Sequence, residues 1–287
     1  MNADSVMSRR FAPVVQTYDW RDSALYALAL GFGSDPCDED ELPYVFEGRP
    51  QEVVPSQCVT LGWPPFWQND PATGIDWVHI LHGEQHFQLH RPMPLQTTVR
   101  ATHRVAGIED KGLRRGALVH FDTELHSMAS GVHLASVKSV HFLRGDGGCG
   151  SRGAVRPPLA VLDPEATPTA WIDYRTAPQA ALLYRLASHD LMPLHADPQV
   201  ARRAGFERPI AHGLNTLGLA CRAILKRFAT GRPSRLCAMA VRFVHPAYPG
   251  ETIRVEMFER ADGVRFRARA LDRGVVVLDR GECRLAP

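Results

Sequence analysis

The sequence predicts an α+β protein made of two similar halves, each a helix followed by a long-stranded antiparallel sheet. Two helix-forming segments recur along the chain, each followed at a distance by a similar proline-containing connection. Each connection leads into strand-like runs separated by tight turns. The chain has 287 residues, of which 45% are hydrophobic and 22% are charged, a composition typical of a globular protein.

The two repeated helices share an apolar face and a tyrosine that aligns them. Residues 22–30 carry leucines at helical spacing, with Asp22 or Ser23 as the N-cap and Gly31 as the end. In residues 178–186 a proline suits the first turn, and three leucines form one face. A helix cannot bury its apolar stripe alone, and a sheet has one apolar face, so we expect each sheet to wrap around its helix.

The connections at residues 90–97 and 245–252 resemble each other, and three strand-like runs follow each of them. The predicted strands are 98–106, 113–126 and 132–143 in the first half, and 253–260, 264–270 and 275–285 in the second. The predicted turns are 110–112, 130–131, 261–263 and 272–274. Glycine and proline gather between 145 and 169, so we expect a repeat at 1–150, a linker at 151–168 and a repeat at 169–287.

Charge and cysteine content exclude several classes of protein. The formal net charge is +2, and the longest basic clusters are pairs, so no nucleic acid partner is expected. Six scattered cysteines without a C-x-x-C pair predict reduced thiols and a cytoplasmic location. The longest apolar stretch, at 24–32, is too short for a bilayer, and Arg9-Arg10 is not followed by an apolar segment. No membrane association or secretory signal is therefore expected.

The segment 188–198 holds the densest group of reactive side chains. Pro193 prevents the second helix from continuing, so Asp190 and His195 are predicted to lie on a loop. An Asp-Pro pair then starts a short helix, at 197–205, that fixes the loop from its other end. A carboxylate and an imidazole can between them take and give a proton, as adding water to a C=C bond requires.

This spacing alone is a weak indication, since a surface pair of polar residues is the commoner outcome. Metal binding by Asp190, His195 and His212 is an alternative, but no helical ligand spacing supports it. We therefore expect no metal and no separate cofactor.

A second element begins at His212-Gly213. Residues 214–228 predict a buried helix with basic residues in its last turn. The Gly213 amide at its start can stabilise a thioester oxygen as that oxygen becomes an enolate. Alternatively, Gly213 only permits close helix packing.

These segments resemble the MaoC-like (R)-specific enoyl-CoA hydratases, the hydratase 2 group. The resemblance rests on 184–186, Asp190, 193–195, 197–198, 204–206, 209–210 and 212–214, and in the first half on 26–28, 82–85, 90–92 and 142–148. It implies a double hot-dog fold in which only the second repeat keeps the hydratase motif. It also implies a lyase of fatty acid metabolism, a homodimer, and an acyl-CoA substrate whose CoA is not a cofactor.

The resemblance further implies roles for individual residues. Asp190 and His195 would activate water and shuttle its proton, and Gly213 would hold the thioester oxygen. The first repeat would provide room for the acyl chain. The candidates for substrate binding or support are Met192, His212, Asn215, Arg185 and Glu84.

The chain departs from the family pattern at two positions. His189 stands where a glycine precedes the aspartate, and Met192 stands where an asparagine fixes the catalytic water. Asn215 or His189 are the candidates to compensate. Activity is therefore expected to be weak or directed at an unusual acyl group. A non-catalytic acyl-CoA binding protein and an acyl-CoA thioesterase remain the alternatives.

Overall fold

The computed structural model describes residues 1–261 and 263–286. The strands of the first half are β1 (Val14–Tyr18), β2 (Ile80–Leu89), β3 (Thr97–Asp110), β4 (Ala117–Ser127) and β5 (His133–Leu143). Those of the second half are β7 (Ala170–Arg175), β8 (Leu236–Phe243), β9 (Thr252–Arg260), β10 (Gly263–Ala270) and β11 (Val275–Leu285), and a short β6 (Arg152–Gly153) lies between them. The helices are α1 (Ala3–Ser8), α2 (Trp20–Ala29), α3 (Ala180–Ser188), α4 (Pro198–Arg203) and α5 (Gly213–Phe228). Six 3-10 turns complete the described regular structure, at η1 (Leu42–Tyr44), η2 (Pro55–Thr60), η3 (Pro71–Thr73), η4 (Trp77–His79), η5 (Pro193–His195) and η6 (Pro233–Arg235).

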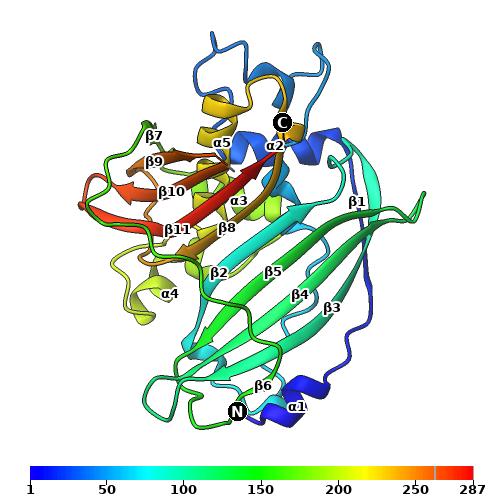
Figure 1. The fold of residues 1–287 in the computed structure, drawn as a ribbon, viewed down its shortest axis with the longest axis vertical. Helices are drawn as coiled ribbons and strands as arrows, with labels where there is room; N and C mark the ends of the chain where they lie inside the picture. Colours follow the sequence, from blue (N-terminus) through cyan, green and yellow to red (C-terminus); the bar gives the residue numbers. More distant parts are fainter. Residues whose placement is uncertain (262, 287) are drawn as a thin grey trace.

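The sheet has a palindromic strand order. Its strands run β1-β3-β4-β5-β2-β8-β11-β10-β9-β7, with β6 pairing to β3 away from this path (Figure 1). Each strand of the first half therefore has a counterpart of the second half at the mirrored place, and β2 and β8 meet at the centre. This arrangement is what a duplicated chain gives, and it confirms the predicted α+β class, with the two similar sets of strands joined into one sheet.

All six predicted runs are strands, namely β3, β4, β5, β9, β10 and β11. The run predicted from residue 113 starts at Ala117, because Gly112 and Gly116 both adopt positive φ and form the turn before it. The predicted turn at 261–263 includes Asp262, which lies outside the described residues. Strands β1, β2, β7 and β8 were not predicted.

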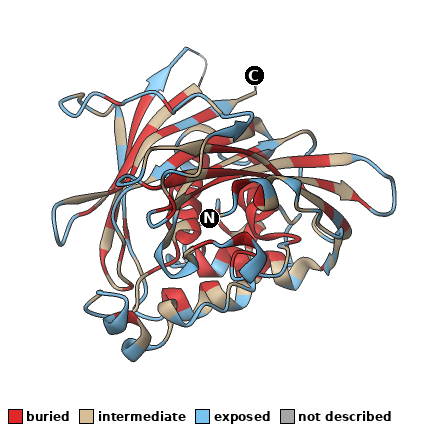
Figure 2. Ribbon diagram, turned by 90° about the horizontal axis from the view of Figure 1, so that it is seen from below, coloured by how far each residue is buried: buried red, intermediate tan, exposed pale blue. Residues whose placement is uncertain are grey.

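The two halves are joined through the antiparallel pair β2–β8. The register runs from Glu84 opposite Arg242 to Gln88 opposite Ala238. Because the sheet is continuous across this pair, buried side chains of both halves belong to one large cluster. Figure 2 shows these buried residues between the sheet and the helices that it covers.

The aligned helices α2 and α3 pack against each other, and the rings of Tyr26 and Tyr184 lie 5.9 Å apart. The predicted cap at Asp22 or Ser23 is wrong. Asp19 is the N-cap, and Asp22 completes a capping box from the third helical position. Pro178 likewise precedes the first turn of α3, whose N-cap is Gln179.

The second half of the sheet was expected to wrap around α3, and this is wrong: it wraps around α5, while α3 packs on α2. Helix α5 packs against β7 to β11, and most of its residues are buried. Gly218 lets Leu30 approach it, since a Cβ there would lie 2.3 Å from the leucine side chain. In the first half the fully buried 3-10 turn η2 packs against α5, β2 and β5.

The segment 154–169 crosses the outer face of the sheet between β6 and β7 without regular structure (Figure 1). Arginines of β10 hold it there, since Arg265 donates to the carbonyl of Ala160 and Arg267 to that of Pro164. The domain boundaries at 150 and 168 stay a prediction. Among the described residues, no helix combines the length and the apolar character needed to cross a membrane.

Candidate active site

The loop that carries Asp190 starts where α3 ends. His189 follows the helix with φ of +58°, a left-handed conformation that turns the chain sharply. The Asp190 amide then donates to Ser188 Oγ at 3.3 Å. One carboxylate oxygen, Oδ1, accepts from the Met192 amide at 3.2 Å. The Met192 amide thereby holds the carboxylate from within its own loop.

His195 lies on the 3-10 turn η5, which begins at Pro193. Its Nδ1 is 2.9 Å from the carbonyl oxygen of Ile210. Because a carbonyl only accepts, Nδ1 carries the hydrogen, and Nε2 keeps its lone pair. Asp197 caps α4 as predicted, accepting from the amides of Gln199 and Val200.

His212 contacts both His195 and Asp190. It is buried as the N-cap of α5, and its ring stacks on His195 with centroids 3.7 Å apart. Its Nε2 lies 3.3 Å from the backbone carbonyl of Asp190 and 4.0 Å from Oδ2 of the carboxylate. Tyr184 also packs against His212, with ring centroids 5.0 Å apart.

The structure thus brings Asp190, His195 and His212 together, with one donor atom of each within 4.8 Å of the others. Burial lowers the pKa of His195 and lowers that of His212 to about 4. Both imidazoles are therefore neutral at neutral pH. A neutral imidazole nitrogen beside a carboxylate is an arrangement that can remove a proton from water.

Two of the predicted supporting residues act on the loop. Met192 is exposed and contributes its backbone amide to Asp190, with no side-chain hydrogen bond. Arg185 on α3 donates to the carbonyl of Leu191 at 3.4 Å and so ties the loop to the helix.

Gly213 is the first residue of α5, beside the cluster. Its amide makes no hydrogen bond to another described residue, as expected for a helix start. A Cβ at this position would lie 3.0 Å from the ring of Phe243, so close packing also requires the glycine. The geometry is compatible with both predicted roles.

The second half and the first half of the chain match two family models. Residues 161–279 match the MaoC like domain, and residues 16–145 match the MFE-2 hydratase 2 N-terminal domain. The chain is 34% identical to peroxisomal enoyl-CoA hydratase 2 of Arabidopsis thaliana, over 96% of this chain and 93% of the relative.

The chain belongs to the MaoC-like hydratase 2 family.

Other members extend the similarity. A probable enoyl-CoA hydratase 2 of Dictyostelium discoideum is 32% identical over the whole of this chain and 97% of its own length. The crystal structure of a MaoC-like dehydratase from Phytophthora capsici superimposes with a TM-score of 0.85 at 31% identity, covering 99% of this chain and 98% of that one. A Mycobacterium tuberculosis protein described as a double hotdog fold shares 15% identity and a TM-score of 0.58, over 96% of both chains. The predicted double hot-dog fold is confirmed.

Of the two departures from the family pattern, His189 has a structural explanation and Met192 has none. His189 adopts the positive φ that favours the glycine of the family pattern, and its side chain is exposed. Asn215 is buried, and its Nδ2 donates to the carbonyl of Ala29 at 2.9 Å. That bond ties α5 to α2, so the Asn215 amide nitrogen is engaged away from Asp190.

Glu84 lies on β2 at the junction of the halves. Its carboxylate is 3.4 Å from Nε2 of His86, and its Cα faces Arg242 across the pair. Glu84 therefore contributes to the β2–β8 junction between the two halves. Its role in substrate binding stays a prediction. Sequence reasoning missed the carbonyl of Ile210 and the ring of Phe243, since neither a backbone carbonyl nor a single aromatic carries a local sequence pattern.

Proposed function

We propose that this chain reversibly adds water across the double bond of a trans-2-enoyl-CoA to give an (R)-3-hydroxyacyl-CoA. Membership of a hydratase family supports an enoyl-CoA hydratase. The proposed acid–base mechanism rests on one observation, that the Asp190 carboxylate and the neutral imidazole of His195 converge beside His212.

In this mechanism, Asp190 and His195 hold the two hydrogens of one water. The Nε2 lone pair of His195 takes one proton while the water oxygen bonds to C3 of the substrate. The electron pair of the C2–C3 bond then shifts toward the thioester oxygen. The resulting imidazolium beside the Asp190 carboxylate gives the proton to C2, and the two transfers restore the starting enzyme.

The enolate oxygen formed between the two proton transfers needs a hydrogen-bond donor. The Gly213 amide is free among the described residues and stands at the positive end of α5. Such a donor stabilises the developing charge more than the neutral thioester, so it lowers the barrier.

The direct test follows the absorbance of crotonyl-CoA and of longer enoyl-CoAs, with chiral analysis of the product. Asp190→Asn and His195→Gln are each expected to lower kcat by about 10²–10⁴. Asp197→Asn is the matched control, because asparagine caps a helix as well as aspartate. It should leave the rate unchanged.

Two outcomes would contradict the proposal and distinguish the alternatives. Release of free CoA, detected with a thiol reagent, would show a thioesterase. Binding of enoyl-CoA without turnover at any chain length would show a non-catalytic binding protein, the alternative motivated by Met192. The homodimer and the cytoplasmic location stay predictions.

A further inference from the structure

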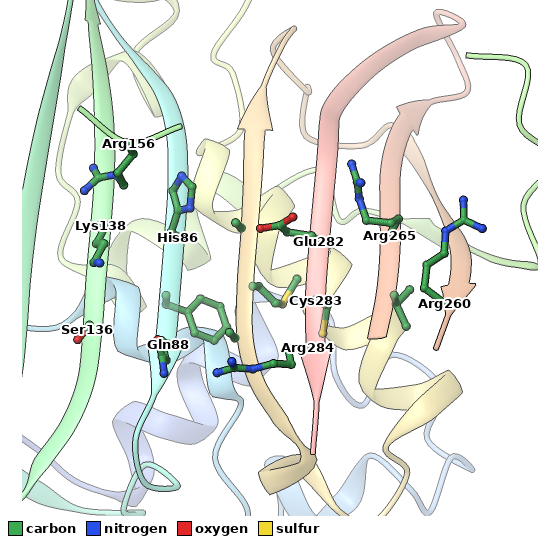
Figure 3. A pocket seen from close by; sticks show the side chains of 15 residues that line it. His86, Gln88, Ser136, Lys138, Arg156, Arg260, Arg265, Glu282, Cys283 and Arg284 are labelled. Atoms are coloured by element: carbon green, nitrogen blue, oxygen red, sulfur yellow. The ribbon is translucent and has the colours of Figure 1, made fainter. Parts of the chain in front are cut away.

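A groove of about 610 Å³ lies at the junction of the two halves, on the outer face of the sheet (Figure 3). Its lining includes side chains of β5, β2, β8, β11 and β10 and one residue of the crossing segment 154–169. On β2, His86 and Gln88 face the groove side, the buried Phe87 between them also contributes to the lining, and the buried Gln85 does not. The short side chains of Ala238 and Ala240 leave the centre hollow.

Cationic side chains surround this groove. Lys138 and Arg156 stand on one side, Arg260 and Arg265 on the other, and Arg284 between them (Figure 3). The lining contains one carboxylate, that of Glu282, and one imidazole, that of His86, whose Nε2 is paired with Glu84. Five cations against the Glu282 carboxylate and the Asp122 carboxylate that pairs with Arg156 give +3, in a chain whose net charge is +2. Positive charge is thus concentrated here.

Two of the arginines are held in place by neighbouring groups. Arg156 bonds to Asp122 at 2.5 Å and to the carbonyl of Ser139 at 2.8 Å, and its buried Nε makes no hydrogen bond. Arg265 donates to the carbonyls of Gly281 and Ala160. Because their positions are fixed before any ligand arrives, little side-chain entropy is lost on binding.

The remaining three cations have no carboxylate partner. Among the described residues, no ion pair involves Lys138, Arg260 or Arg284. Like charges facing one hollow repel each other, and an anion with several charges removes that repulsion. Guanidinium groups match phosphate oxygens in geometry, and pockets of 300–1,000 Å³ are typical of small-molecule sites.

We propose that this groove binds a phosphorylated ligand of nucleotide size, of the nucleoside diphosphate class. The diphosphate contacts Lys138, Arg156 and Arg284. The neutral floor at Ala238, Ala240 and Val264 accepts the sugar and base. None of Asp190, His195, His212 and Gly213 lines the groove. The site is therefore distinct from the candidate active site and independent of the proposed reaction.

Isothermal titration of the full chain with ADP tests this site, with inorganic pyrophosphate as a second probe. One ADP per chain is expected, with affinity that falls as salt is raised. Lys138→Ala and Arg284→Ala should each weaken binding by about tenfold, the loss expected for one charge-assisted contact. The control Arg114→Ala removes one positive charge from an exposed turn, as each test variant does from the groove, and should leave affinity unchanged.

A second measurement separates the groove from the substrate site. ADP bound in the groove should not compete with enoyl-CoA, and Asp190→Asn should bind ADP normally. Competitive inhibition of enoyl-CoA hydration by ADP, together with an ADP affinity that Lys138→Ala leaves unchanged, would overturn the proposal. Absence of ADP binding at low salt would also overturn it. Light scattering gives a third test: a dimer that Arg284→Glu dissociates would overturn the proposal, because a second copy of the chain would then cover the groove.

Discussion

The rings of His195 and His212 are stacked with centroids 3.7 Å apart and planes tilted by 26°. One ring nitrogen of each lies at hydrogen-bonding distance from a backbone carbonyl, Nδ1 of His195 from Ile210 and Nε2 of His212 from Asp190. His212 thereby fixes the imidazole of His195 by stacking, and it fixes the loop that carries the Asp190 carboxylate by a hydrogen bond to the Asp190 backbone carbonyl. A single buried side chain thus sets the relative position of both proposed catalytic groups.

This relationship predicts the behaviour of His212→Phe. Phenylalanine keeps a flat ring against His195 but removes the hydrogen bond to the Asp190 carbonyl. We expect kcat to fall about 10- to 100-fold, because a small misplacement of reacting groups is costly, with little change in KM. Steady-state kinetics on crotonyl-CoA measure it. His212→Gln, which can still donate to the carbonyl, should retain more activity than His212→Phe, and equal loss in both variants would contradict this role.

The lowered pKa of His195 predicts the acid limb of the pH profile. The neutral imidazole is the active form, so activity is lost as pH falls through its pKa, which burial holds below the ordinary 6.5. The Arg185 guanidinium also lowers it. Arg185→Ala should therefore move the acid limb of log kcat/KM to higher pH, while Arg185→Lys keeps the charge and should move it less. A limb unchanged in Arg185→Ala would show that another group titrates.

The positive φ of His189 predicts a stabilising substitution. A non-glycine residue in this conformation is strained, and glycine is not. His189→Gly should raise the free energy of unfolding by about 0.5–1 kcal/mol after the entropy of the unfolded glycine is subtracted. Thermal unfolding should show a Tm higher by about 1–2 °C. Ala187→Gly, inside α3, is the control and should lower stability by about 1 kcal/mol.

The contact between Gly213 and Phe243 predicts a rescue experiment. Gly213→Ala keeps the backbone amide but places a Cβ 3.0 Å from the ring, so the start of α5 must shift. We expect loss of both stability and kcat. Adding Phe243→Leu relieves the contact and should restore both. If the double mutant regains stability but not activity, then Phe243 itself contacts the substrate.

The hydrogen bonds of the cluster predict how it responds to chelation. His212 donates Nε2–H to a carbonyl, and its other nitrogen, Nδ1, is buried. Using His212 as a metal ligand would therefore break a bond that orients Asp190. Dialysis against EDTA should leave the hydratase rate unchanged, and elemental analysis checks the metal content. A rate lost on dialysis and restored by a divalent cation would contradict the proposed water activation.

Much of the fold was predictable because its information is local. The six strands with turn glycines at their ends, the short helix capped by Asp197 and the buried helix from Gly213 all follow from periodicity and capping. The segment from Asp190 to His195 was also identified, because Pro193 separates a helix from a loop rich in reactive groups.

The rest depended on contacts between distant parts of the chain. Strands β2 and β8 were not predicted because each has one of its two partners in the other half of the chain, 150 to 158 residues away. Pairing of two half-buried strands also leaves a mixed pattern in each. The N-cap at Asp19 was missed because three acidic or serine residues compete within five positions, and only the hydrogen bonds choose between them.

By itself, the sequence determined the duplicated order of elements, their turns and the residue types that perform the chemistry, since these are properties of neighbours along the chain. The tertiary structure alone decided which nitrogen of His195 is free, how His212 joins it to Asp190, and where five cations meet around one groove. Those features are set by directions and distances in space, which a linear order of residues does not contain.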